Sequence, residues 1–264
     1  MKKTIILFVL LIVMVRINAM QKFVVINGDS IVLYDLVANQ HIDVFCNKDL
    51  KGWIPVRCVS MGEKYVIELN KYHDNRLGTS NIVLEQLSIA FDQNGNSNYR
   101  IDTIIHIDGK YHRQSMGRTV EIDNIGIYYN DRVLMYAKPS GFRLRGNNNK
   151  TKTILKPIRN KTGIVSYKDV RLSHNGKKVI GIEYVSKKGN DIASPSVIEY
   201  DIEKKEIKKL SLIGEMADYS SDDNYICYIN TKKSACSIYD LAKQKDIFCC
   251  AGQWVLWVID KSFK

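Results

Sequence analysis

The sequence has few of the residues that mark fibrous or disordered chains. Only 4 of its 264 residues are proline and 16 are glycine, which excludes a collagen-like or low-complexity chain. Hydrophobic residues make up 45% of the sequence, so wholesale disorder is excluded as well. Because all-β domains reach this length as single units, one hydrophobic core can serve the whole chain.

The motifs of several enzyme classes are also missing. The sequence contains no G-x-S-x-G elbow, no P-loop and no G-x-G-x-x-G fingerprint. Its cysteines do not form the C-x-x-C pairs of a zinc site. These motifs therefore do not indicate a particular reaction, and we predict no cofactor.

Only one long apolar run is present, and it lies at the N-terminus. Two lysines follow Met1, the stretch from Ile5 to Val15 is apolar throughout, and Ala19 is the small residue that precedes a signal-peptidase cut. The run is too short to span a bilayer as a helix. We therefore predict a signal peptide over residues 1–19 and a single exported domain, periplasmic or secreted, over residues 20–264. This mature chain has no predicted transmembrane segment; an uncleaved N-terminal anchor is the alternative.

Short runs of β-branched and aromatic residues recur along the rest of the chain, and Asn, Asp, Gly or Ser residues bound each run. This pattern is typical of β-strands joined by tight turns. Only the stretch from Ser80 to Phe91 also fits a helix, with Ser80 as its cap. The predicted runs are residues 22–26, 30–34, 64–69, 126–129, 132–136, 179–185 and 225–229.

One pattern occurs twice in the C-terminal half. Residues 172–182 with 197–202, and residues 219–228 with 237–241, each give a Ser/Asp/Asn/Gly turn, an apolar strand, and a second strand that contains Tyr-Asp. Residues 31–36 provide a third copy of the Tyr-Asp strand. The copies recur at a step of about 40 residues, which is the length of a propeller blade.

This pattern resembles the WD40-like repeat of TolB-type β-propellers, and the resemblance is best over residues 170–250. It implies an all-β propeller of about six four-stranded blades, with five possible, that acts as a binding or scaffolding protein. Where that family has Asp and Gly together, this chain has Asn175-Gly176 in one copy and Asp223-Asn224 in the other. The run at residues 253–259 predicts a closing strand beside the N-terminal strands. A β-sandwich is the alternative fold.

The net charge of +11 is local. Residues 138–209 hold 18 basic and 7 acidic residues, whereas the rest of the predicted mature chain is nearly neutral. Within this segment, residues 142–163 contain seven basic residues and no acidic one, which predicts a protruding loop or long hairpin. The seven are Arg143, Arg145, Lys150, Lys152, Lys156, Arg159 and Lys161.

Such a cationic segment predicts a polyanion-binding site, or else a loop that only keeps the protein hydrated. The partners that we expect are an anionic glycan, an anionic lipid headgroup or a protein. Nucleic acid is disfavoured, because no recognition helix or RNA-binding motif accompanies the charge.

Two other groups of residues are candidate sites. His106, Asp108 and His112 could ligate a metal, although Asp108-Gly109 also predicts a simple hairpin turn. This group supports the alternative function, a propeller hydrolase or lyase that acts on an acidic polysaccharide. Residues 92–103 partly match a calcium loop, but Asn94-Gly95 is also a favoured hairpin turn.

Export gives the six cysteines access to an oxidising compartment. Cys227 and Cys236 flank the polar stretch 230–234, so the two could face each other across a hairpin and form a disulfide. Buried free thiols are the alternative, and six cysteines allow 15 pairings that sequence alone does not separate.

Overall fold

The chain is all-β, as predicted. The computed structural model describes residues 21–72, 82–107, 110–115, 118–122, 128–129, 132–137, 141–145, 151–160, 163–187 and 195–260, and within these ranges every regular element is a strand. None of the described residues belongs to a helix with the length and apolar content needed to cross a membrane. The predicted signal peptide, residues 1–19, lies outside the described residues. The chain forms two compact units, one of residues 1–124 with 256–264 and one of residues 125–255.

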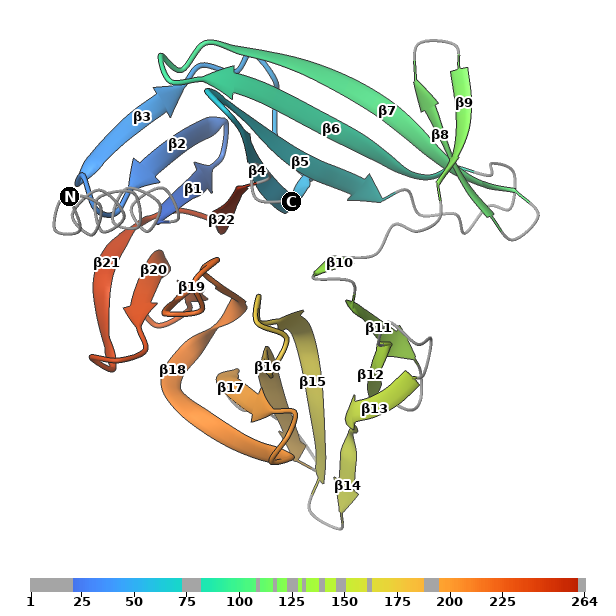
Figure 1. The fold of residues 1–264 in the computed structure, drawn as a ribbon, viewed down its shortest axis with the longest axis vertical. Helices are drawn as coiled ribbons and strands as arrows, with labels where there is room; N and C mark the ends of the chain where they lie inside the picture. Colours follow the sequence, from blue (N-terminus) through green and yellow to red (C-terminus); the bar gives the residue numbers. More distant parts are fainter. Residues whose placement is uncertain are drawn as a thin grey trace, which may run out of the picture. The chain divides into compact units, whose positions relative to one another are not determined.

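The first unit contains a ten-stranded sheet (Figure 1). In the order in which they pair, its strands are β3 (Gln40–Val44), β2 (Ser30–Asp35), β1 (Lys22–Asn27), β22 (Trp254–Asp260), β4 (Ile54–Met61), β5 (Lys64–Tyr72), β6 (Ile82–Asp92), β7 (Ser97–Ile107), β8 (Lys110–Ser115) and β9 (Arg118–Ile122). The C-terminal strand β22 therefore lies between β1 and β4, and it runs parallel to β4. The predicted pairing of the C-terminal run beside the N-terminal strands is confirmed.

Residues 82–92 form strand β6 rather than the helix that the sequence of residues 80–91 also allowed. Its buried residues Leu87, Ile89 and Phe91 are 0–2% exposed and alternate along the chain, which is the period of a strand. The turn that follows has Gly95 at φ +81°, and the Asp92 carboxylate accepts the backbone N–H groups of Asn94 and Asn96. The predicted Asn94-Gly95 hairpin turn is confirmed, and the carboxylate that would open a calcium loop instead closes this turn.

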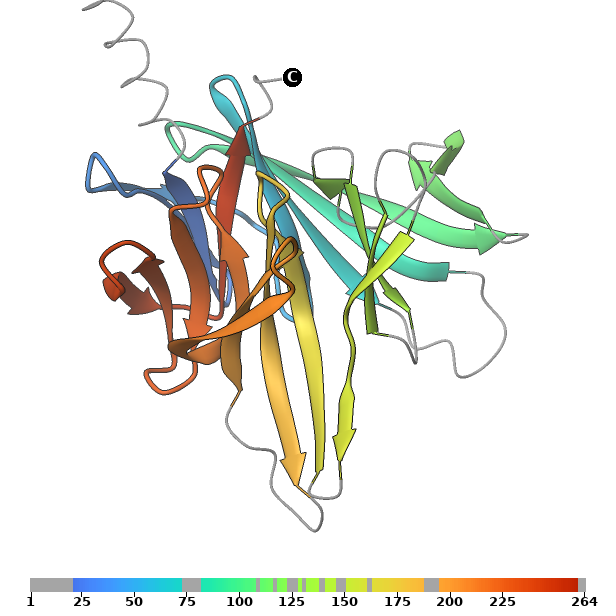
Figure 2. The ribbon, with the colours of Figure 1, turned by 60° about the horizontal axis from the view of Figure 1, so that its bottom comes forward.

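The second unit contains two sheets (Figure 2). The four-stranded sheet has the order β10 (Tyr128–Tyr129), β11 (Arg132–Ala137), β12 (Gly141–Arg145) and β13 (Thr151–Leu155). The eight-stranded sheet has the order β14 (Ile158–Asn160), β15 (Gly163–Leu172), β16 (Lys178–Lys187), β17 (Ser196–Asp201), β18 (Glu206–Tyr219), β19 (Tyr225–Asn230), β20 (Ala235–Asp240) and β21 (Lys245–Ala251).

The long strand β18, which is strongly curved in Figure 1, pairs with β17 on one side and with β19 on the other and so joins two four-stranded groups. Its first part pairs with β17 as far as Ile213, and its second part pairs with β19 from Gly214 onward. A side chain at position 214 would meet the carbonyl oxygen of Ile229 and the ring of Tyr228, so only glycine fits at this bend. Strands β15–β18 and β18–β21 are therefore consecutive groups that share one strand.

Both faces of β16 are buried over residues 179–183, which explains why this strand reads as a continuous apolar run. Val179 belongs to a core cluster with Leu155 and Tyr167, whereas Ile180 and Ile182 belong to a second cluster, which contains residues of β18 and β19. Alternate residues of β16 thus serve two cores.

The three predicted Tyr-Asp strands, β17, β20 and β2, are followed by turns of the same geometry. In each turn the strand's final aspartate accepts at least one backbone N–H group from the turn, and a left-handed residue follows four positions later. The three pairs are Asp35 with Asn39, Asp201 with Lys205, and Asp240 with Gln244. The recurring Tyr-Asp signature is therefore a recurring turn geometry.

Candidate functional site

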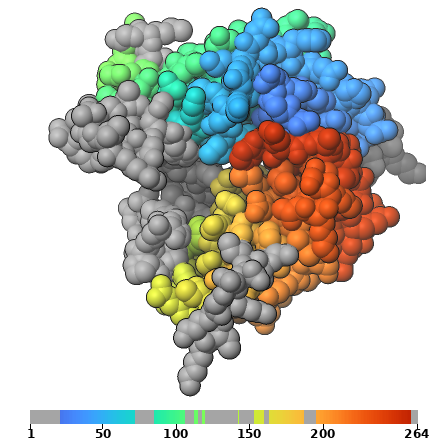
Figure 3. Space-filling view, turned by 180° about the vertical axis from the view of Figure 1, so that it is seen from behind, coloured from blue at the N-terminus to red at the C-terminus, as the bar shows by residue number. Residues whose placement is uncertain are grey.

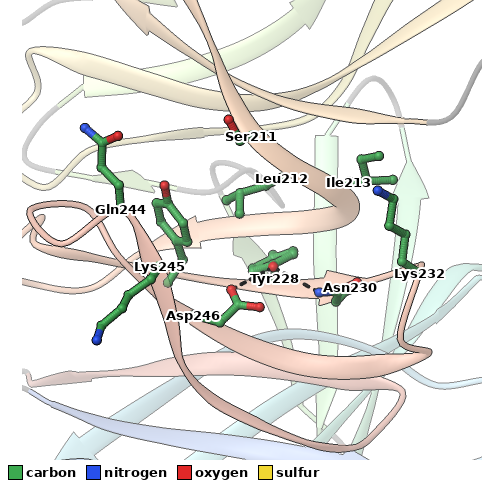
Figure 4. Close-up of a pocket in the computed structure, with 10 residues that line it drawn as sticks. Ser211, Leu212, Ile213, Tyr228, Asn230, Lys232, Gln244, Lys245 and Asp246 are labelled. Atoms are coloured by element: carbon green, nitrogen blue, oxygen red, sulfur yellow. Dashed lines mark hydrogen bonds between the residues drawn. The ribbon is translucent and has the colours of Figure 1, made fainter.

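A cavity of about 250 Å³ opens in the last repeat of the second unit (Figure 4). Strands β18, β19, β20 and β21 and the turns after β19 and β20 line it. Leu212 and Ile213 are its apolar lining residues, and Tyr239 also lines it. The cavity thus combines an apolar wall with the polar groups described next, as small-molecule sites do.

A hydrogen-bonded triad occupies one side of this cavity. The Tyr228 hydroxyl donates to Asp246 Oδ1 at 2.9 Å, and Asn230 Nδ2 donates to the Tyr228 hydroxyl at 3.1 Å (Figure 4). Lys233 Nζ donates to the other oxygen of Asp246 at 3.0 Å. Burial, together with the neighbouring Asp246 carboxylate, raises the pKa of Tyr228, so its hydroxyl stays protonated at neutral pH. Because Lys233 balances the charge of Asp246, the triad presents ordered polar atoms rather than a net negative charge.

Two further lysines lie at the cavity. Lys232 follows β19 and Lys245 begins β21, and both side chains are exposed. In Figure 4 the Lys232 side chain extends toward Ile213, whereas that of Lys245 points away from the Tyr228 ring. A cavity with one balanced carboxylate and the additional cation of Lys232 suits a small polar ligand that carries negative charge. None of these residues was predicted as a site, because Tyr228 and Asp246 are distant in sequence and meet only across the sheet.

A second polar cluster lies at the junction between the two four-stranded groups. Asp223 Oδ1 and Oδ2 accept the backbone N–H groups of His174 and Asn175 at 2.8 and 2.9 Å, and His174 Nδ1 lies 3.4 Å from Asp223 Oδ1. Burial acts to raise the pKa of Asp223, but the hydrogen bonds from His174 and Asn175 outweigh it, so the pKa lies below its usual value. This carboxylate connects the turn of one repeat to the turn of the next.

Bulges in β15 and β18 bring further charges near this junction. Asp169 and Met216 occupy matching left-handed positions in the two bulged strands, with φ of +49° and +55°. Burial raises the pKa of Asp169 and of Asp218, and the nearby Arg171 opposes part of each shift. Carboxyl groups with raised pKa values gather at functional sites more often than elsewhere, so this junction is a second candidate. The sequence analysis did not predict this cluster, because the bulges that bring its charges together appear only in the strand register.

The predicted basic segment is partly within the described residues. Its backbone forms the antiparallel hairpin β12–β13, in which Arg143 and Arg145 take alternate positions of β12 and Lys152 pairs with Leu144. The first part of the predicted segment is therefore a hairpin of two five-residue strands, and a single long hairpin over residues 142–163 is not formed, because β14 follows as a separate strand. Lys156 is exposed, and Arg159 lies exposed on β14. Residues 156–159 are exposed, within the yellow part of Figure 3, whereas Ile154 and Leu155 just before them are buried. Lys150 and Lys161 lie outside the described residues.

The predicted metal group is only partly described. In the β7–β8 hairpin, His106 pairs with Tyr111 and His112 pairs with Ile105, so the two histidines take positions on opposite faces of the sheet. The expectation that His112 returns beside His106 is therefore wrong, because the register is offset by one residue. Asp108 lies outside the described residues. Among those that the structure describes, no group of three His, Cys, Asp or Glu side chains could hold a metal ion.

The predicted disulfide between Cys227 and Cys236 is not formed, and all six cysteines are present as thiols. In the register of β19 and β20, Cys227 pairs with Ile238 and Cys236 pairs with Ile229. The two cysteines are thus diagonal neighbours, and diagonal positions lie about 7–8 Å apart, which is beyond the usual span of a disulfide. The prediction identified the correct hairpin but not its register.

Comparison with known proteins concerns the fold alone. No family model matches the chain, and no curated protein matches it. Among solved structures, a nidogen/laminin complex chain matches with a TM-score of 0.50 at 6% identity, over 90% of this chain and 97% of that one. A putative 6-phosphogluconolactonase from Bacteroides uniformis matches at 9% identity and TM-score 0.44, over 90% of this chain and all of the other. An oligogalacturonate lyase in complex with manganese matches at 10% identity and TM-score 0.33, over 83% of this chain and 58% of that one. The lactonase and the lyase have propeller-like folds.

Proposed function

We propose that the chain is an exported β-propeller that binds a polyanionic partner through its basic segment. The propeller is supported by the repeated Tyr-Asp turns and by the grouping of strands into fours. The three sheets of the described residues can be divided into five such groups, β22 with β1–β3, β4–β7, β10–β13, β15–β18 and β18–β21, with β8, β9 and β14 as additional strands. Five is the lower of the two blade counts expected from the sequence. In this proposal β22 completes the blade of β1–β3, so that the first and last parts of the chain share one sheet.

The observation that carries the binding proposal is the concentration of charge. Eighteen basic residues against seven acidic ones lie in residues 138–209, and the described members Lys156 and Arg159 are exposed on one short stretch. Cations that point into water within a Debye length of one another create a positive potential that attracts polyanions. The ligands that fit are acidic glycans and clustered lipid phosphates, which share closely spaced negative charges.

The test compares two double charge reversals of equal size. Lys156→Glu with Arg159→Glu alters the basic segment, and Lys51→Glu with Lys64→Glu alters exposed lysines in the other unit. On a heparin column we expect the first variant to elute at clearly lower salt than the wild type and the second to elute close to it. Equal elution of the two variants would show that only net charge matters and would remove the proposed site.

The source of the negative charge is settled by a second measurement on the same proteins. Sedimentation with vesicles that contain anionic lipid reports lipid binding, and titration with heparin in solution reports glycan binding. If the wild type binds heparin but not vesicles, the partner is an acidic glycan, and the reverse result assigns a lipid surface. If it binds neither at low salt, the proposal fails. The enzymatic alternative, a hydrolase or lyase for acidic polysaccharide, remains a prediction.

A further inference from the structure

The last hairpin of the second unit places two cysteines directly opposite each other. Cys236 on β20 pairs with Cys250 on β21. Directly opposed residues of antiparallel strands have Cα atoms about 4.5–5.5 Å apart, and disulfides need about 4.4–6.8 Å. The Cys236–Cys250 pair therefore meets the distance requirement that the diagonal pair with Cys227 fails.

The surroundings of the two thiols differ. Cys236 is 1% exposed, and its Sγ lies 3.4 Å from the carbonyl oxygen of Trp254. Burial raises the pKa of Cys236 to about 12, and the neighbouring Cys250 and Cys249 add to the shift. Cys250 is partly exposed, so a reagent in solution reaches it before it reaches Cys236. Cys249 is exposed but pairs with Ser237, which places it on the opposite face of the sheet.

We infer that Cys236 and Cys250 form a cross-strand disulfide when the chain meets a low-molecular-weight disulfide such as oxidised glutathione. The Cys250 thiolate attacks one sulfur of the reagent, forms a mixed disulfide and releases one thiol. Cys236 then loses its proton, attacks the Cys250 sulfur and displaces the second thiol. The two cysteines are oxidised, the reagent is reduced to two thiols, and these take up the two protons.

The disulfide would link the edge strand β21 covalently to its neighbour β20. Strand β21 is the last strand of the eight-stranded sheet, and the surface of this end of the unit is orange to red in Figure 3. Asp246 lies on the same strand and accepts a hydrogen bond from the Tyr228 hydroxyl in the cavity. Since the thiol pair and the cavity lie on opposite faces, the disulfide holds the cavity wall without entering the cavity. This inference does not depend on the proposed polyanion site.

The experiment maps the bond directly and uses the adjacent cysteine as its control. The folded wild type and the variants Cys249→Ser and Cys250→Ser are incubated with oxidised glutathione, alkylated without reduction, digested and analysed by mass spectrometry. We expect a peptide that links residue 236 to the 249–250 pair in the wild type and in Cys249→Ser, lower by two hydrogen masses than the two peptides together. The Cys250→Ser variant should lose it.

Three outcomes would overturn the inference. These are alkylation of both Cys236 and Cys250 in the treated wild type, a link from Cys236 to Cys249 that survives in Cys250→Ser, and a link from Cys236 to Cys227. Circular dichroism of each variant before oxidation verifies that the hairpin is folded. If Cys250→Ser does not fold, loss of the linked peptide from Cys250→Ala, a second variant that keeps a small apolar side chain, serves the same purpose.

Discussion

The two neighbouring repeats of the second unit build the same turn from different residues. In the first repeat, the backbone N–H of Ser173 donates to the carbonyl oxygen of Lys178, and the Oγ of Ser173 accepts the backbone N–H of Lys178. Gly176 in this turn is left-handed, with φ +69°. In the second, Ser220 bonds to Tyr225 in the same way, and the left-handed residue at φ +58° is Asp223. The distances in the two turns are equal, at 2.9 Å for each of these bonds. The turn geometry is therefore independent of the residue at its left-handed position.

The difference lies in what that residue contacts. Glycine at position 176 has no side chain, whereas Asp223 reaches the backbone N–H groups of His174 and Asn175 in the preceding repeat. A left-handed aspartate costs about 1 kcal/mol of strain relative to glycine. Two charge-assisted hydrogen bonds outweigh this cost. A departure from the repeat pattern thus marks the residue that couples one repeat to the next.

The largest expected effect follows from Asp223→Ala. This change keeps the strained backbone and leaves two backbone donors of the neighbouring turn without their acceptor, so we expect a loss of about 3 kcal/mol in the free energy of unfolding. Urea denaturation followed by fluorescence measures it. A loss below about 1 kcal/mol would mean that the two repeats are not coupled through this residue.

Asp223→Gly separates strain from coupling. Glycine restores the residue found in the first repeat and removes the strain, so we expect a loss about 1 kcal/mol smaller than that of Asp223→Ala. The same denaturation series gives both values. An equal loss in the two variants would show that position 223 carries no strain.

The two serines should behave alike. Ser173→Ala and Ser220→Ala each remove a buried hydroxyl that accepts one backbone N–H group, so each should cost about 1 kcal/mol, with similar values for the two. Parallel unfolding curves compare them. If the two losses in the free energy of unfolding differed by more than about 1 kcal/mol, the two turns would not be equivalent.

The smallest effect is a pH dependence. Because the pKa of Asp223 is lowered in the folded state, its stabilising contribution is present above the unfolded-state value of about 4 and is lost as pH falls through the lower folded value. The stability difference between the wild type and Asp223→Asn should therefore shrink below about pH 4. A difference that stays constant from pH 7 to pH 3 would assign the effect to the side chain's shape rather than to its charge.

Much of the fold could be predicted from the sequence because its determinants are local. Runs of apolar residues, turn residues and the Tyr-Asp signature identified ten of the 22 described strands, and these include the three Tyr-Asp strands. The stretch 80–91 was ambiguous because Leu84, Leu87 and Phe91 fit helical spacing. It forms the strand β6, which pairs with β5 on one side and with β7 on the other. Local pattern thus gives the elements, and neighbouring strands settle the ambiguous ones.

Less of the candidate sites could be predicted, because these depend on register and on contacts between repeats. The predicted Cys227–Cys236 disulfide and the predicted approach of His112 to His106 were both wrong, because each depends on a strand register that no local sequence pattern encodes. Tyr228 and Asp246 meet across an intervening strand, and Asp223 acts on a turn 48 residues away. The basic segment is visible in composition alone, and its role as a polyanion site stays a prediction.

The most direct test of the proposed function is the salt dependence of heparin affinity for the wild-type protein, measured by titration calorimetry from low to high ionic strength. If the basic segment is a polyanion site, the affinity should fall steeply and continuously with salt, because each neutralised charge releases counterions. An affinity that is unchanged across the range, or no binding at low salt, would contradict the account.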